Sequence, residues 1–125
     1  MRKTILVVDD DSSITRMAIK ILEPLGHEVF IAANGKEALE ISRKHGEKID
    51  LLLTDVVLPI INGRELAQIL QQERPGMQII LMSGYPADIV APKGIIESNI
   101  HFINKPLTRT TLTNIIQTAL DKKIG

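Results

Sequence analysis

Cysteine and tryptophan are absent from this chain of 125 residues, and its aromatic side chains are one tyrosine and two phenylalanines. Without cysteine, the chain has neither disulfide bonds nor thiolate metal sites. This composition is compatible with a reducing cytoplasm, where we expect the protein to lie. With so few aromatic rings, the core must be aliphatic, and a platform that stacks nucleic-acid bases is not expected.

The chain also lacks an excess of charge of either sign and a long apolar run. Fifteen Lys and Arg residues balance fifteen Asp and Glu residues, so no bulk field attracts nucleic acid or an anionic membrane. No apolar run approaches the roughly 18 residues that cross a bilayer. The apolar part of the amino-terminal stretch MRKTILVVDD is too short for a signal peptide. We therefore expect no direct binding of nucleic acid, no membrane insertion and no export signal.

Short apolar runs are spread through the chain and have the character of buried strands. They are residues 4–8 (TILVV), 28–32 (EVFIA), 49–54 (IDLLLT), 78–82 (QIILM) and 100–103 (IHFI). Runs of this length with few internal charges suit parallel strands that are covered on both faces. A chain of 125 residues fits one compact domain, which we expect to span residues 1–125.

Longer periodic segments separate these runs and predict helices. The first carries an apolar stripe at helical spacing, formed by Ile14, Met17, Ala18, Ile21, Leu22 and Leu25. The other helices are marked by capping, turn or terminating residues, namely Asn34 with Glu37, Gly46, the Asn62-Gly63 turn, Pro75 and Thr108.

The segment 86–99, PADIVAPKGIIESN, interrupts this pattern. Pro92 and Gly94 break any long helix, so we expect a short turn of helix from about Ala87 and then irregular chain. The element order is then βαβαβαβ(α)βα, with the fourth helix short or irregular. Strands that alternate with helices predict an α/β fold, in which one doubly wound parallel sheet of five strands has helices on both faces.

Polar side chains follow four of the predicted strands, and they are Asp9 and Asp10, Asp55, Ser83 and Lys105. Any one of them alone could be a helix cap, a turn residue or a solvated loop residue. Because the carboxyl ends of parallel strands meet at one edge of the sheet, we expect all of these side chains to lie near one another. Clustered carboxylates repel unless a hard cation lies among them, which favours Mg²⁺, with Mn²⁺ as an alternative.

These side chains suit phosphoryl chemistry. With a metal ion present, Asp55 can act as a carboxylate nucleophile towards a phosphoryl group and form an aspartyl-phosphate. Lys105 and the metal would neutralise the equatorial oxygens of that group, and the Ser83 hydroxyl would donate a hydrogen bond to one of them.

The whole chain resembles the receiver domain of two-component response regulators, the CheY-like superfamily. The resemblance rests on VVDDD with the pair Asp9-Asp10, LLLTDVVLPIING around Asp55, LMSG with Ser83, and FINKP with Lys105. It implies the flavodoxin-like strand order 2-1-3-4-5 and a role in a phosphorelay. Asp55 would receive a phosphoryl group from the phosphohistidine of a histidine kinase or histidine phosphotransfer domain, or from a small phosphodonor. Such a domain phosphorylates itself and is not a conventional enzyme.

The resemblance also implies a set of metal ligands. Asp10 and Asp55 would bind Mg²⁺ together with the backbone carbonyl of Val57, and Asp9 would act mainly through a metal-bound water. Asp11 lies outside this acidic pair and opens the first helix. We expect it to be the N-cap of that helix, with a direct metal role as the alternative.

The same resemblance implies a conformational switch. Ser83 would move towards the phosphoryl group and Phe102 would rotate inward, which remodels the face made by the fourth helix, the fifth strand and the last helix. The Lys105-Pro106 peptide bond would be cis. The broken segment 86–99 is similar to the receiver of a hybrid sensor histidine kinase, which relays its phosphoryl group to a histidine phosphotransfer partner.

Other functions stay open at this point. A receiver-like interaction domain would keep the fold without any phosphorylation. ILVVDDDSS also resembles the motif of haloacid dehalogenase-type phosphatases, in which Asp9 would be the nucleophile and Asp11 the acid/base, although the chain is short for that fold. A flavodoxin-like FMN module is disfavoured, because carboxylates at the first turn would repel the phosphate of the flavin.

Overall fold

The computed structural model describes residues 2–45, 48–84 and 99–124 of the chain. The elements are β1 (Thr4–Val8), α1 (Ser12–Leu22), the 3-10 turn η1 (Glu23–Leu25), β2 (Glu28–Ala32), α2 (Gly35–His45), β3 (Leu51–Asp55), α3 (Gly63–Glu73), β4 (Gln78–Ser83), β5 (Ile100–Asn104) and α4 (Arg109–Ile124). Each predicted strand is present, with ends that differ from the prediction by at most two residues.

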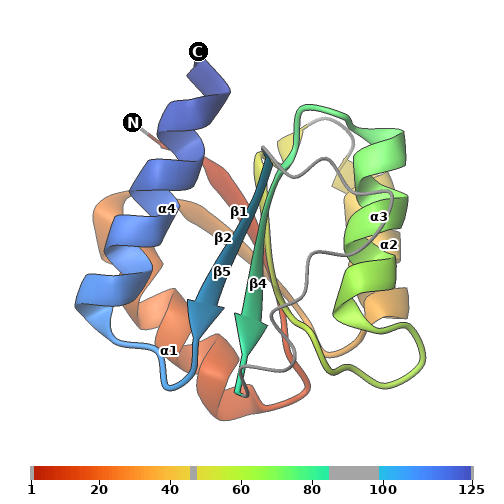
Figure 1. Ribbon diagram of the computed structural model, residues 1–125, viewed down its shortest axis with the longest axis horizontal. Helices are drawn as coiled ribbons and strands as arrows, with labels where there is room; N and C mark the ends of the chain where they lie inside the picture. Colours follow the sequence, from red (N-terminus) through yellow and green to blue (C-terminus); the bar gives the residue numbers. More distant parts are fainter. Residues whose placement is uncertain (1, 46–47, 85–98, 125) are drawn as a thin grey trace.

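The strands form one sheet in the order β2-β1-β3-β4-β5, and every neighbouring pair is parallel. This arrangement confirms the doubly wound α/β fold and the strand order. Figure 1 shows α1 and α4 on one face of the sheet and α2 and α3 on the other. Since all strands run the same way, their carboxyl ends meet at a single edge of the sheet.

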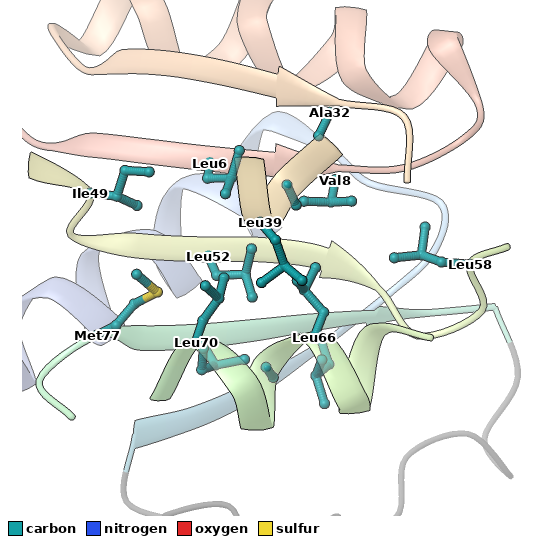
Figure 2. Close-up of a cluster of buried hydrophobic side chains, with 14 of the residues drawn as sticks. Leu6, Val8, Ala32, Leu39, Ile49, Leu52, Leu58, Leu66, Leu70 and Met77 are labelled. Carbon is teal, nitrogen blue, oxygen red and sulfur yellow. The ribbon is translucent and has the colours of Figure 1, made fainter. Parts of the chain in front are cut away.

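Each face of the sheet packs on its own apolar core, because side chains of a strand alternate between the two faces. On one face, Leu6 and Leu52 of the sheet meet Leu39 of α2 and Leu66 and Leu70 of α3 (Figure 2). On the other face, a second cluster joins the alternate strand residues to α1 and α4; it includes Ile5, Leu51, Ala18, Leu112 and Ile116. The core is aliphatic, as the composition predicts.

Predicted helix starts agree with the observed caps. The Asp11 carboxylate accepts a hydrogen bond from the Ser13 N–H at 2.9 Å and so caps α1. Asn34 accepts one from the Glu37 N–H at 2.9 Å, while the Glu37 carboxylate accepts the N–H of Ala33 at 2.8 Å, which is close to a capping box. Thr108 caps α4 through the N–H of Thr111 at 3.1 Å.

Two predictions about the first helix are wrong in detail. Met17 is 36% exposed because it lies about 100° around the helix from the buried Ala18, at the margin of the apolar stripe. Leu25 is 47% exposed because α1 ends at Leu22, and Pro24 starts the turn η1 in its place. Proline has no N–H for the helical ladder, so the stripe cannot continue to Leu25.

The third helix also starts slightly earlier than predicted. Asn62 is the N-cap, since its side chain accepts the N–H of Glu65 at 2.9 Å, and Gly63 is already the first helical residue. Residues 86–98 of the predicted irregular segment 86–99 lie outside the described residues, and so does the predicted helix end at Gly46. Within the described ranges, no helix has both the length and the apolar character needed to cross a membrane.

Candidate functional site

The carboxyl edge of the sheet brings together the polar residues that the sequence singles out. Asp55 and Ser83 are the last residues of β3 and β4, while Asp9 and Lys105 directly follow β1 and β5. These four residues come from neighbouring parallel strands, so residues nearly 100 positions apart in the chain lie side by side. The fold alone therefore explains their convergence.

Three carboxylates form the acidic part of the site. Asp9, Asp10 and Asp55 each offer one oxygen, and these oxygens all lie within 4.8 Å of one another. Asp9 is 2% exposed and Asp55 is 8% exposed, whereas Asp10 is exposed. Backbone groups fix the two buried carboxylates: the Asp11 N–H donates to Asp9 Oδ1 at 2.9 Å, and the Val57 N–H donates to Asp55 Oδ1 at 3.2 Å.

Lys105 supplies the opposing charge. Its Nζ donates to Asp9 Oδ2 and to Asp55 Oδ2, at 3.0 Å in each case. Burial raises the pKa of Asp9, and the hydrogen bonds from Asp11 and Lys105 offset only part of that effect. Burial acts to lower the pKa of Lys105, but its hydrogen bonds to Asp55 and Asp9 outweigh burial, and the pKa is raised. Lys105 is thus a protonated cation at neutral pH.

Two features of the backbone fix the position of Lys105. Its N–H donates to the carbonyl oxygen of Ser83 at 2.8 Å, and the Lys105-Pro106 peptide bond is cis. This hydrogen bond fixes the segment after β5 to the end of β4. The ammonium group is thereby held over the carboxylates of two strands that are not its neighbours in the sheet, β1 and β3.

The donor atoms of the acidic cluster fit a hard divalent cation. Carboxylate oxygens are the ligands that Mg²⁺ uses, and it binds through one or two carboxylates together with waters and phosphate oxygens. Lys105 donates to the Oδ2 atoms of Asp9 and Asp55, whereas Asp10, the third acid of the cluster, is exposed to solvent. The residues present therefore fit an Mg²⁺ ion.

Comparison with known proteins agrees with this geometry. The family model of the response regulator receiver domain matches residues 5–117. The chain belongs to that family. It is a receiver domain of the kind found in two-component systems, and its five-stranded parallel sheet is the CheY-like fold.

Relatives of this receiver domain occur in proteins of different sizes. It is 31% identical over 120 residues to the sensor kinase CckA of Brucella abortus, covering 96% of the chain but 13% of the kinase. It is 33% identical over 118 residues to the response regulator receiver protein CpdR of the same organism, covering 94% of the chain and 97% of that protein. Against the DNA-binding transcriptional regulator NtrC of Azospirillum brasilense, it spans 24% of the regulator.

Solved structures share the fold over nearly the whole receiver domain. A CheY-like receiver domain protein from Methanospirillum hungatei superimposes with a TM-score of 0.84 at 34% identity, covering 98% of this chain and 97% of that one. The receiver domain of the hybrid histidine kinase CckA gives a TM-score of 0.79 at 31% identity, covering 94% and 98%.

The other residues singled out from the sequence lie in the strands of the sheet or in the connections that follow them. Ser83 is 1% exposed at the end of β4, and Phe102 is half-buried in β5 and packs against the core shared with α2 and α3. Val57 is 64% exposed, directly beside Asp55 in the chain. The Asp11 carboxylate is bound by the N–H and hydroxyl of Ser13, which lowers its pKa, so its observed contacts are those of a helix cap.

Gly63 is a site residue whose role the sequence did not reveal. A Cβ atom at this position would lie 2.0 Å from the carbonyl oxygen of Asp55, and the Gly63 N–H donates to the carbonyl of Val56 at 2.9 Å. The start of α3 is therefore in contact with the backbone of Asp55. The Asn-Gly pair shortly after an apolar run was the available signal, but by itself it indicates only a turn.

Proposed function

We propose that this receiver domain accepts a phosphoryl group on Asp55 in a Mg²⁺-dependent reaction and passes the signal on through a change in conformation. One observation carries the proposal: the nearly buried carboxylate of Asp55 is held by Lys105 at 3.0 Å, with oxygens of Asp9 and Asp10 within 4.8 Å. A structural ion pair requires one acid and one cation, whereas this site gathers three acids, two of which share one lysine.

The donor is a phosphohistidine. An oxygen of Asp55 attacks the phosphorus atom, the P–N bond breaks, and the imidazole keeps the electron pair and takes a proton from solvent. Lys105 already donates to Asp55 Oδ2 and can donate to the phosphoryl oxygens as charge gathers on them. The Ser83 hydroxyl, at the end of the adjacent strand β4, acts as a further donor.

Asp10 and Asp55, with the backbone carbonyl of Val57, would hold Mg²⁺, and Asp9 would hold it through water. When bound, the ion neutralises negative charge on the phosphoryl oxygens. The backbone hydrogen bonds that position Asp9 and Asp55 support this assignment, because they hold the two carboxylates close together.

Ser83 and Phe102 carry the signal away from the site. The two residues lie on adjacent strands. Phe102 of β5 pairs with Leu81 of β4, and Ser83 is two residues further along β4. Movement of Ser83 towards a phosphoryl group opens space behind it, into which Phe102 turns, so the surface of β5 and α4 changes. A protein that recognises this surface then reads the phosphorylation state.

The partners are a histidine kinase, a histidine phosphotransfer domain, or both, in the cytoplasm. Similarity to the receiver of the hybrid kinase CckA supports a place in a hybrid sensor kinase or a multistep relay. The balanced charge of the chain supports recognition of protein and not of nucleic acid by this domain itself.

The test is incubation with acetyl phosphate and MgCl₂, followed by intact-mass measurement. We expect one phosphoryl adduct on the wild-type protein, and none on Asp55→Asn or after chelation of the metal. An Asp11→Asn variant serves as the control and should still be labelled, since asparagine also caps a helix. A protein that stays unlabelled, or an adduct that survives in Asp55→Asn, would overturn the proposal and favour an interaction domain or another acceptor.

A further inference from the structure

The dipeptide Asn-Gly occurs twice in the chain, as Asn34-Gly35 and as Asn62-Gly63, and each copy opens a helix. Asparagine followed by glycine is the pair most prone to deamidation, because glycine has no Cβ to hinder attack of its backbone nitrogen on the side-chain amide. The proposed phosphoryl chemistry uses neither pair. Two copies of one reactive dipeptide in one fold allow their surroundings to be compared directly.

The amide carbon that is attacked has the same kind of neighbour in both copies. Asn34 Oδ1 accepts the N–H of Glu37 at 2.9 Å, and Asn62 Oδ1 accepts the N–H of Glu65, also at 2.9 Å. A donor at this oxygen stabilises the negative charge that gathers there when a nucleophile adds to Cγ. The carbon therefore does not distinguish the two asparagines. Exposure alone would favour Asn62, which is exposed, whereas Asn34 is half-buried.

At Asn62, both the nucleophile and the leaving group are held. The Gly63 N–H donates to the carbonyl of Val56 at 2.9 Å. The leaving nitrogen, Asn62 Nδ2, donates to Glu65 Oε1 at 2.7 Å. Attack on Cγ requires rotation about ψ of Asn62, which is 165°, so that the Gly63 nitrogen turns towards the side chain. A Cβ on Gly63 would lie 2.0 Å from the carbonyl oxygen of Asp55, so the glycine cannot turn without displacing the end of the central strand β3.

At Asn34, neither group is held in this way. Within the residues that the structure describes, the Gly35 N–H and Asn34 Nδ2 make no hydrogen bond. Gly35 is also closely packed, since an added Cβ would lie 2.8 Å from Ile61 Cβ and 3.1 Å from the Ile61 carbonyl oxygen. Ile61, however, is half-buried in the connection before α3, and such a segment gives way more easily than the end of a central strand.

We propose that Asn34 is the residue at which the folded protein deamidates, and that the contacts of Asn62 and Gly63 protect the second pair. The Gly35 nitrogen loses its proton and forms a bond to Asn34 Cγ. The bond from Cγ to Nδ2 then breaks, so that ammonia leaves and a cyclic imide remains. Water opens the imide at either of its carbonyl groups, which gives aspartate or isoaspartate. The reaction needs no other reactant and does not depend on phosphorylation of Asp55.

The two products should differ in stability. Aspartate at position 34 caps α2 as well as asparagine does, and its charge lies at the positive end of the helix. Isoaspartate lengthens the main chain directly before Gly35, which has no free space beside Ile61. The aspartate form should therefore be as stable as the wild type, whereas the isoaspartate form should pack less well at the start of α2.

The test follows deamidation of the folded wild-type protein by peptide mapping with mass spectrometry, after incubation in warm, mildly alkaline buffer. Heavy-oxygen water in the buffer marks each new carboxyl group, so deamidation during digestion is not counted. A parallel sample is unfolded in urea. Asn34→Ser and Asn62→Ser are a matched pair of variants, because serine also caps a helix and cannot form the imide.

In the folded protein we expect Asn34 to react at least about tenfold faster than Asn62, whereas in urea the two rates should agree within about twofold. Asn34→Ser should remove most of the deamidation of the folded protein, and Asn62→Ser should leave it unchanged. Equal rates in the folded protein, or a faster rate at Asn62, overturn the proposal, and so does a folded protein in which neither asparagine reacts while both react in urea. A difference of the same size that persists in urea also overturns it, since the flanking residues and not the fold would then set the selectivity.

Discussion

Lys105 Nζ lies 3.0 Å from Asp55 Oδ2, although the two residues are 50 positions apart in the chain. The same nitrogen lies 3.0 Å from Asp9 Oδ2. A single cation thus links the segment after β5 to carboxylates of β1 and β3. The ammonium group thereby opposes the charge repulsion between two carboxylates that lie close together in a largely buried site.

Replacing Lys105 with methionine should lower the free energy of unfolding by about 1–3 kcal/mol in the absence of Mg²⁺, because Asp9 and Asp55 lose their shared cation in a partly buried site. Chemical denaturation at neutral pH measures the change. Lys48→Met is the control: Lys48 pairs with Glu28 at 2.8 Å, but its side chain is 54% exposed. Its loss should cost less than about 1 kcal/mol. Equal effects of the two substitutions would contradict the role given to Lys105.

Mg²⁺ should stabilise the folded protein, since the acidic cluster that we propose as its site exists only in the folded state. At a concentration about 100 times its dissociation constant, the gain would be about 2.7 kcal/mol, visible as a higher Tm. Asp10→Asn should lose most of this response, while Asp11→Asn should keep it, because the Asp11 side chain caps α1. A response to Mg²⁺ that is the same in both variants would argue against the cluster as the metal site.

Gly63→Ala should destabilise the protein by at least about 3 kcal/mol, because the added Cβ would overlap the backbone at Asp55 and the start of α3 would have to move. Gly76→Ala is the matched control, since nothing lies within 4 Å of a Cβ atom at that position. Urea denaturation of both variants checks this prediction. If Gly63→Ala folds as stably as Gly76→Ala, the contact between α3 and Asp55 is not as tight as described.

His27 should make stability depend on pH. Burial lowers the pKa of His27, and its Nδ1 accepts the N–H of Lys3 at 3.2 Å, which requires an unprotonated nitrogen. The unfolded chain therefore binds a proton more readily than the folded one. This contribution to stability is complete above the unfolded pKa of about 6.5 and is lost as the pH falls through the lower folded value.

A His27→Gln variant removes this titration. Between about pH 7.5 and pH 5, the wild type should lose unfolding free energy relative to the variant, as measured by denaturation at several pH values. A constant difference between the two proteins across this range would show that His27 has the same pKa in the folded and unfolded states.

The sequence predicted the sheet and the position of the acids because both depend on local patterns. Runs such as residues 49–54 are apolar throughout, which indicates a strand buried on both faces, and the polar residue at the end of each run marks the shared edge. The caps at Asp11 and Thr108 were likewise readable, since a cap bonds to residues within the same helical turn.

Other features were not predicted, either because a local signal was overlooked or because the feature depends on contacts between distant segments. The periodicity of the first helix suggested a core position for Leu25, but Pro24 ends the helix before the stripe can reach it. The approach of Gly63 to Asp55 and the γ-turn centred on Ile60, whose φ is +72°, arise from packing of the loop against α2 and the sheet. Local propensity would place glycine or asparagine at a position with a positive φ, so an isoleucine there gives no warning of the turn.

The most direct test of the account identifies the phosphorylated residue chemically. The protein labelled with acetyl phosphate is reduced with borohydride, which converts an aspartyl-phosphate to homoserine, and its peptides are sequenced by mass spectrometry. We predict homoserine at position 55 and unmodified aspartate at positions 9, 10 and 11. Homoserine at Asp9 would indicate the nucleophile of a phosphatase, and the absence of homoserine from Asp55 would contradict the account.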